Sequence, residues 1–178
     1  KVIRSLTTRG ATHVAVSPKG KDVAFILNGD VYVTTIDFST TKQITCTPER
    51  ERCVDFRADG RAVVYDSERG GIWSIYESEI VNDKEAVMTY CTELKERRLT
   101  DGVTTSFQPQ YSPDGKKVAY FQNREAICIV DVKSGKMHTA MDAKYTYSYS
   151  DGDQYFTWSP DGKWLLANYM GNGGWNNV

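Results

Sequence analysis

The side chains of this sequence that could carry out catalysis are few. His13 and His138 are the only histidines, and one of them would have to serve as the base of a Ser-His-Asp triad. A serine on a strand-to-helix elbow would need the pattern G-x-S-x-G, which occurs nowhere in the chain. Both histidines lie in segments with the pattern of strands, which favours a structural role. The sequence therefore predicts no catalytic residue, and a chain that is not itself an enzyme.

Metal ligands are equally sparse. Zinc sites use closely spaced ligand pairs, whereas the four cysteines are isolated along the chain: Cys46, Cys53, Cys91 and Cys128. Cys46 and Cys53 flank a single loop, so a disulfide between them stays open. Asp151-Gly152-Asp153 has two carboxylates, fewer oxygen ligands than a calcium loop supplies, and is interpreted as a turn. No metal or cofactor is predicted.

Aromatic side chains are the remaining candidates for a binding site. They gather in one stretch near the C-terminal end: Tyr145, Tyr147, Tyr149, Tyr155 and Trp158. Aromatic rings bury large areas and also present polar edges, so such a group could hold a peptide at the surface. The same rings could instead pack in the core between neighbouring elements. The sequence alone leaves both interpretations open.

A fourfold repeat indicates the elements that position these residues. Its copies are VAVSPKGKDVAF from Val14, VDFRADGRAVVY from Val54, PQYSPDGKKVAY from Pro109 and FTWSPDGKWLLA from Phe156. The shared glycines are separated by 40, 55 and 47 residues and are Gly20, Gly60, Gly115 and Gly162. A repeat of about 40–50 residues made of short strands is typical of a β-propeller.

The central tetrapeptide of the repeat predicts a tight hairpin. In Ser112-Pro113-Asp114-Gly115 the proline presets the first turn position, and the glycine takes the left-handed conformation that follows. We expect all four shared glycines to have positive φ. Arg57-Ala58 replaces Ser-Pro in the second copy, which weakens the turn signal there.

The predicted fold is all-β: one partial β-propeller over residues 1–178, with about three and a half four-stranded antiparallel blades. Residues 1–10 would supply the outer strand of a preceding blade, since Arg4-Ser5-Leu6-Thr7 matches the ERRLT strand at Glu96–Thr100. The blades themselves are expected at 11–47, 51–100, 105–142 and, incomplete, 152–178. Terminal blades would leave strand edges and apolar faces bare, so we expect further blades, a partner or self-association to cover them.

Residues Glu79–Lys95 form an insertion in the second blade, and its structure stays open. Ala86, Val87, Tyr90 and Leu94 follow a helical spacing, with Asp83 as a cap. The same residues could extend two strands into a long protruding hairpin. We favour the hairpin because it preserves the connectivity of the blade.

Composition excludes several classes of partner. The net charge of −1, with both signs interspersed, gives no electrostatic basis for binding nucleic acid. No apolar run approaches the length of a membrane span, and Lys1–Thr7 lacks the apolar core of a signal peptide.

Beyond the repeat, the sequence resembles a known family. The SPDGK hairpin followed by an R-x-L-T strand is similar to the WD-like repeats of TolB and tricorn-type propellers. Three segments outside the repeat resemble the propeller region of tricorn-like serine peptidases of Gram-negative bacteria: Thr47–Arg52, Ser67–Glu77 and Tyr145–Gln154. This resemblance covers essentially the whole chain.

The resemblance implies a function that the residues do not show by themselves. It implies a periplasmic protein whose propeller guides or gates peptide substrates for a peptidase domain located elsewhere in the protein. Its partners would be peptides or unfolded proteins, the remaining blades and the peptidase domain. The alternatives are a TolB-type scaffold that binds a protein partner, and the propeller lid of a prolyl-oligopeptidase-type enzyme.

Overall fold

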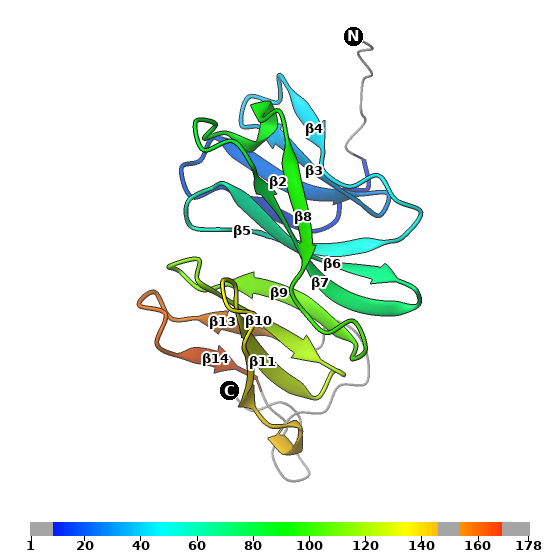
Figure 1. Cartoon of the computed structure of the whole chain (residues 1–178), viewed down its shortest axis with the longest axis vertical. Helices are drawn as coiled ribbons and strands as arrows, with labels where there is room; N and C mark the ends of the chain where they lie inside the picture. Colours follow the sequence, from blue (N-terminus) through cyan, green and yellow to red (C-terminus); the bar gives the residue numbers. More distant parts are fainter. Residues whose placement is uncertain (1–8, 146–153, 169–178) are drawn as a thin grey trace.

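The computed structural model describes residues 9–145 and 154–168, and in this part the chain is all-β apart from two single-turn 3₁₀-helices (Figure 1). Its strands form three four-stranded antiparallel sheets and one two-stranded sheet, in chain order. Blade one contains β1 (Val14–Val16), β2 (Asp22–Leu27), β3 (Asp30–Thr35) and β4 (Thr41–Gln43). Blade two contains β5 (Glu51–Phe56), β6 (Ala62–Arg69), β7 (Ile72–Ile80) and β8 (Leu94–Arg98). Blade three contains β9 (Ser106–Tyr111), β10 (Lys117–Gln122), β11 (Ala126–Asp131) and β12 (Met137–Met141). Blade four contains β13 (Phe156–Trp158) and β14 (Leu165–Ala167).

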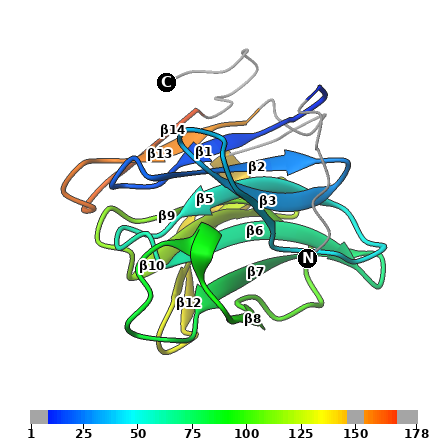
Figure 2. The same ribbon diagram turned by 90° about the horizontal axis from the view of Figure 1, so that it is seen from above.

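The blades stack face to face as in an open propeller, which confirms the predicted fold class. The first strands, β1, β5, β9 and β13, lie toward one side of the molecule, and the outer strands β8 and β12 lie on the other (Figure 2). We call the first strands the inner strands. Each inner strand is the edge of its sheet, because it pairs only with the second strand of its own blade.

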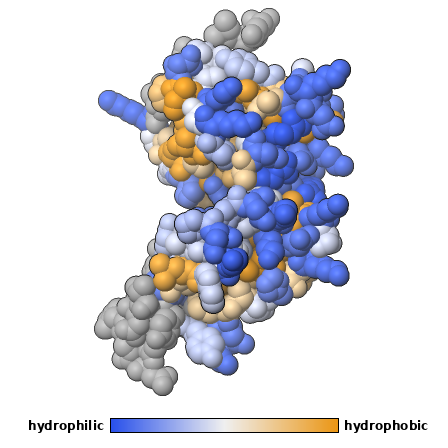
Figure 3. All heavy atoms as spheres, turned by 90° about the vertical axis from the view of Figure 1, so that its left-hand side faces the viewer, coloured by the Kyte–Doolittle hydropathy of each residue, from blue (hydrophilic) through white to orange (hydrophobic). Residues whose placement is uncertain are grey.

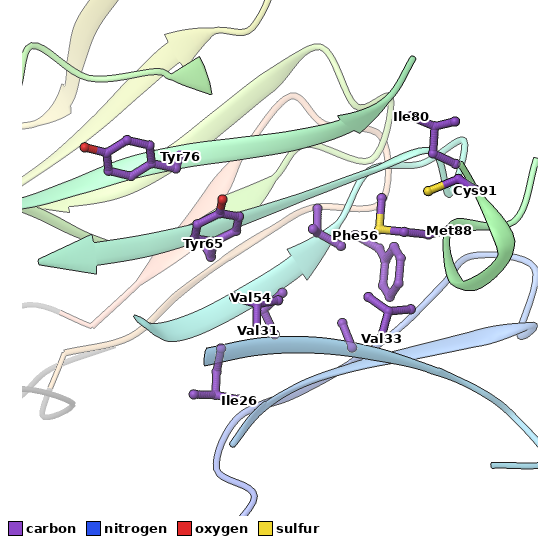
Figure 4. Packing of buried hydrophobic residues seen from close by; sticks show 12 residues of the cluster. Ile26, Val31, Val33, Val54, Phe56, Tyr65, Tyr76, Ile80, Met88 and Cys91 are labelled. Atoms are coloured by element: carbon purple, nitrogen blue, oxygen red, sulfur yellow. The ribbon is translucent and has the colours of Figure 1, made fainter. Parts of the chain in front are cut away.

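Three apolar clusters hold consecutive blades together. The first lies between blades one and two and includes Val33, Val54 and Tyr65 (Figure 4). The second joins Val64 of blade two to blade three, and the third joins Phe121 of blade three to blade four. Successive side chains of a strand point to opposite faces, so a central strand such as β6 is apolar on both: Ala62–Tyr65 is fully buried.

The hairpins of the repeat fit against one another from blade to blade. Their glycines have φ of 62°, 74°, 69° and 68° at Gly20, Gly60, Gly115 and Gly162, which confirms the predicted positive φ. A Cβ built on Gly162 would contact the ring of Pro113 at 3.5 Å, and one on Gly115 would come within 2.7 Å of Arg57 Cγ. Glycine therefore serves both the turn and, at position 115, the close approach of two blades.

The insertion in blade two differs from both predicted alternatives. β7 and β8 pair only as far as Ile80 and Leu94, so the long protruding hairpin is wrong, and no α-helix forms. The intervening loop folds back with one 3₁₀-turn, η1 (Met88–Tyr90), against blade one. Its Met88 N–H and Thr89 hydroxyl both donate to the carboxylate of Asp22 on β2.

Other expectations can be placed as well. Cys46 and Cys53 are not joined to each other, so the disulfide left open by the sequence is not formed. Both ends of the stack carry exposed apolar side chains, such as Val14 and Val16 in blade one and Trp164 and Leu166 in blade four. Arg4–Thr7 and Asp151–Asp153 lie outside the described residues. No helix within residues 9–145 and 154–168 is long and apolar enough to cross a membrane.

Candidate functional site

The inner strands together line a concave hollow of about 350 Å³, which we call the axial groove. Its wall comes from all four blades: His13, Val14, Ala15, Val16, Cys53, Val54, Asp55, Gln108, Pro109, Gln110, Tyr155 and Phe156. The volume lies at the lower end of the range for ligand-binding pockets. The inner strands of a propeller face its axis in this groove, which is therefore the candidate site.

The repeat places one residue of each inner strand at the same register position, and those of the first three blades line this wall. On the inner strands, Ala15 pairs with Ala24, Asp55 with Val64, Gln110 with Ala119 and Thr157 with Leu166. These four inner-strand residues occupy the same position of the repeat, and we call them the axial layer: Ala15, Asp55, Gln110 and Thr157. Asp55 is the one ionisable member of the layer.

Asp55 is held rigidly between blades two and three. Its Oδ2 accepts a hydrogen bond of 2.8 Å from the Tyr111 N–H on β9, and its Oδ1 accepts one of 2.9 Å from the Phe56 N–H. Burial raises the pKa of Asp55 to about 6, and the two backbone donors oppose that shift. A carboxylate has about four acceptor sites, so Asp55 retains acceptor capacity beyond these two bonds.

The exposed backbone groups of the inner strands are capped by side chains. Val54 N–H donates to His13 Nδ1 at 3.2 Å, and the Trp158 Nε1–H donates to the Gln110 carbonyl at 3.2 Å. Asp66 Oδ1 accepts from Cys53 N–H at 2.7 Å and its Oδ2 from Gln108 N–H at 3.1 Å. Unpaired strand edges invite the addition of another strand, so this capping disfavours a ligand that would extend the β5 or β9 sheet.

Burial also shifts the pKa values of His13 and Asp66, the two ionisable groups that cap these strands. It lowers the pKa of His13, although the carboxylate of Asp66 and the bond from Val54 act in the opposite direction. Burial raises the pKa of Asp66, and the guanidinium of Arg52 and the backbone N–H donors oppose this shift. His13 is thus an acceptor in its neutral form here, which suits a structural role, and His138 lies on outer strand β12 opposite Ile129.

Much of the groove rim is apolar and exposed. Val14, Val16 and Tyr155 have exposed fractions of 59%, 58% and 66%. Behind this surface, the Oε1 of Gln110 is buried and has no hydrogen-bond partner among the described residues. Figure 3 views the side that carries the repeat hairpins: hydrophilic side chains dominate at the outer strands, and apolar ones gather mainly toward the inner strands.

The structure brings only part of the predicted aromatic group to this groove. Tyr155 lines it, whereas Trp158 is half-buried and packs against the third core cluster. Tyr145 ends a 3₁₀-turn, η2 (Ala143–Tyr145), is half-exposed and contributes nothing to the groove wall. Tyr147 and Tyr149 lie outside the described residues.

A second hollow lies between the hairpins of blades two and three. Its wall includes Arg57, Asp59, Asp114, Lys116 and Asp131, and its volume is about 880 Å³. The charges there pair with one another, as Arg57 does with Asp59 at 3.0 Å and Lys116 with Asp114 at 3.7 Å. Within the described ranges, no group of three histidine, cysteine or acidic side chains is placed to hold a metal ion.

Comparison with known proteins identifies the fold. No family model and no curated protein matches the chain. The tricorn protease structure is similar with a TM-score of 0.72 and 17% identity, over 97% of this chain and 15% of that one. A protein assigned as TolB from Agrobacterium tumefaciens has a TM-score of 0.64 and 22% identity, over 91% of this chain and 58% of that one.

TolB from Acinetobacter baumannii is similar with a TM-score of 0.59 and 22% identity, over 96% of this chain and 42% of its own. The fold is that of a TolB- and tricorn-type propeller. The chain spans 58% of the Agrobacterium tumefaciens structure, 42% of TolB from Acinetobacter baumannii and 15% of the tricorn protease.

Proposed function

We propose that this chain is a non-catalytic propeller segment of a tricorn-like serine peptidase, in which it guides or gates peptide substrates. The observation that carries the proposal is the axial groove, a concave wall on four successive inner strands with exposed apolar side chains and the carboxylate of Asp55. Likeness to the tricorn protease over 97% of the chain supports this choice of parent, as does the resemblance of the segments between the repeats.

A groove of this kind suits an extended peptide. Its wall is a rigid set of strands, so a ligand can be bound without ordering a loop, which lowers the entropic cost of association. Val14, Val16 and Tyr155 would contact apolar side chains of the peptide, and Asp55 would accept a hydrogen bond from its polar groups. The peptidase activity would belong to another domain of the parent protein.

The proposal includes a location and partners. By resemblance, the parent protein would be periplasmic, and further blades of the same protein would cover the exposed apolar end of the stack at Trp164 and Leu166. Self-association through the same end is the alternative for the isolated chain.

A TolB-type scaffold that binds a folded protein partner is the second candidate. The observation that favours it is sequence identity, which is 22% with both TolB structures against 17% with the tricorn protease. The coding sequence after Val178 separates the two: a PDZ domain and peptidase core would support the first candidate, and an early stop the second.

The function of the groove can be tested on the purified chain. We expect fluorescein-labelled casein, an unstructured protein, to bind with an increase in anisotropy and to remain intact on a gel. Val16→Glu, which places a charge on the exposed groove wall, should weaken binding. Val103→Glu introduces the same charge on an exposed valine outside the groove and should not. Absence of binding, or equal loss in both variants, would refute a binding role, and cleavage of casein would refute the non-catalytic one.

A further inference from the structure

The axial groove has an unbalanced set of polar groups. Among the described residues that line it, Asp55 is the only carboxylate, and none is a lysine or arginine. Gln110, next to Asp55 in the axial layer, has a buried Oε1 without a hydrogen-bond partner. Because that amide oxygen is buried, the charged acceptor that the wall offers to a ligand is Asp55, and the exposed surface around it is apolar at Val14, Val16 and Tyr155. The wall therefore presents one carboxylate and no fixed positive charge.

Asp55 cannot easily turn away from the groove or be neutralised by a neighbour. The backbone N–H groups of Phe56 and Tyr111 fix its carboxylate. The nearest guanidinium network, at Arg57, is already engaged by Asp59, Glu77 and Glu79. An acidic ligand side chain at this level would meet a like charge in a partly desolvated wall, and a basic one would meet its complement.

We propose that the axial groove selects extended peptide segments by charge, accepting basic or uncharged residues beside Asp55 and disfavouring acidic ones. This inference rests on the proposed function, since it concerns the peptides that the groove would guide. The carboxylate of Asp55 supplies the charged acceptor, and the valine and tyrosine side chains of the rim supply the apolar contact.

The selectivity should depend on pH. Burial raises the pKa of Asp55 to about 6, so its charge is present at pH 8 and mostly lost at pH 5. Burial lowers the pKa of His13, which favours its neutral form. The titratable and charged groups around Asp55 on the packed elements are His13, Cys53, Asp66, Arg52, Tyr111, Glu77, Arg57 and Tyr155. Asp66 is fully buried behind the wall, whereas the carboxylate that lines the groove itself is Asp55.

The test uses the full chain and three dye-labelled, acetylated and amidated octapeptides of alanine, glycine and valine. The peptides differ only in a central Lys, Gln or Glu. At pH 8 and low salt we expect the Lys peptide to bind about tenfold more tightly than the Glu peptide, with the Gln peptide between them. Asp55→Asn should abolish this difference, whereas Glu125→Gln, which removes an exposed carboxylate outside the groove, should preserve it. Raising salt should reduce the ratio.

The outcomes separate this inference from the proposed function. If the Gln peptide binds and the Lys and Glu peptides bind equally, charge selection is wrong and the peptide-guiding function stands. If no peptide binds, both fail. If Asp55→Asn does not fold, the pH arm decides on the native chain: the preference for Lys over Glu must vanish by pH 5, and its persistence there would overturn the role of Asp55.

Discussion

Gly115→Ala offers a quantitative test of how the hairpins hold adjacent blades together. Gly20 and Gly115 occupy the same turn position with φ of 62° and 69°, but their surroundings differ. A Cβ at Gly20 would have no atom within 4 Å, whereas one at Gly115 would lie 2.7 Å from Arg57 Cγ and 3.3 Å from the Ala58 nitrogen. Gly20→Ala therefore introduces backbone strain alone, and Gly115→Ala adds a clash between blades.

The expected magnitudes follow from that difference. The left-handed conformation costs an L-residue about 1–2 kcal/mol, which is the expected loss of unfolding free energy for Gly20→Ala. Overpacking adds about 1–3 kcal/mol at Gly115. Relief by movement of Arg57 is restricted, because its guanidinium binds Asp59 and Glu79 at 3.0 and 2.5 Å.

The assay is equilibrium urea unfolding of the two variants, with the midpoint converted at constant m-value. Arg57→Ser restores the serine found in the other three hairpins. In the double variant Arg57→Ser/Gly115→Ala the clash is relieved, so the loss of unfolding free energy should be smaller than the sum of the two single losses. The difference, the coupling energy, should account for most of the overpacking cost. Equal destabilisation by Gly20→Ala and Gly115→Ala, or no coupling with Arg57, would refute the contact as a determinant of stability.

Three further predictions concern buried groups, each checked by urea unfolding. Glu77→Gln should destabilise the chain by about 3–5 kcal/mol. The buried carboxylate binds Arg97 at 2.6 Å and the Tyr111 hydroxyl at 2.6 Å. An effect below 1 kcal/mol would contradict this prediction. Met88→Ala should cost about 2–5 kcal/mol since its side chain is fully buried, whereas truncating the exposed Tyr90 should be nearly neutral; equal effects would mean that the loop does not pack. The pKa of Asp55, raised to about 6 from an ordinary value of 3.8, means that the folded state binds its proton more tightly. The contribution of Asp55 to the free energy of unfolding therefore falls by about 2–3 kcal/mol as pH rises from below 4 to above 6. The unfolding free energy of the native chain minus that of Asp55→Asn should fall by this amount over the same pH range.

Local chemistry explains why the blades could be predicted from sequence. A hairpin is specified by a few neighbouring residues, such as Ser112-Pro113-Asp114-Gly115, in which the Ser112 hydroxyl accepts from Lys117 N–H at 3.0 Å and Asp114 Oδ1 from Lys116 N–H at 3.1 Å. Even the weakened copy forms its turn, because Asp59 accepts from Arg61 N–H at 2.8 Å in the same way. Apolar strands on both sides then fix the order of the sheet.

The insertion in blade two could not be predicted in the same way. Its backbone is fixed by Asp22, which is 66 residues from Met88 and was indistinguishable in sequence from any other strand carboxylate. Met88 and Cys91 enter the first core cluster from this loop, so burial between two blades replaces the regular pairing or helical hydrogen bonds that local spacing suggested. Tertiary contact here overrides a weak local preference.

The axial groove could have been found from the repeat itself, although the aromatic stretch was the more obvious signal. Asp55 and Gln110 are polar residues inside apolar inner strands, and aligned copies put them at one level. The described residues of the aromatic stretch lie in three different environments. Tyr155 lines the groove, Trp158 packs in the core and Tyr145 lies apart from both. Composition alone cannot separate these roles, because rings suit both surface contact and burial.

The axial layer also differs from the rest of the repeat in a way that bears on its role. The turn requires glycine in all four copies because positive φ excludes most side chains, and the flanking positions require apolar residues because neighbouring blades cover them. The axial layer contains Ala15, Asp55, Gln110 and Thr157, four side chains of different chemistry at equivalent positions. A position that served blade packing alone would need similar volume and polarity in each copy, and one that faces a ligand would not. On the proposed function, the scaffold can thus keep its blades constant while the inner strands of the first three blades present different groups to the groove.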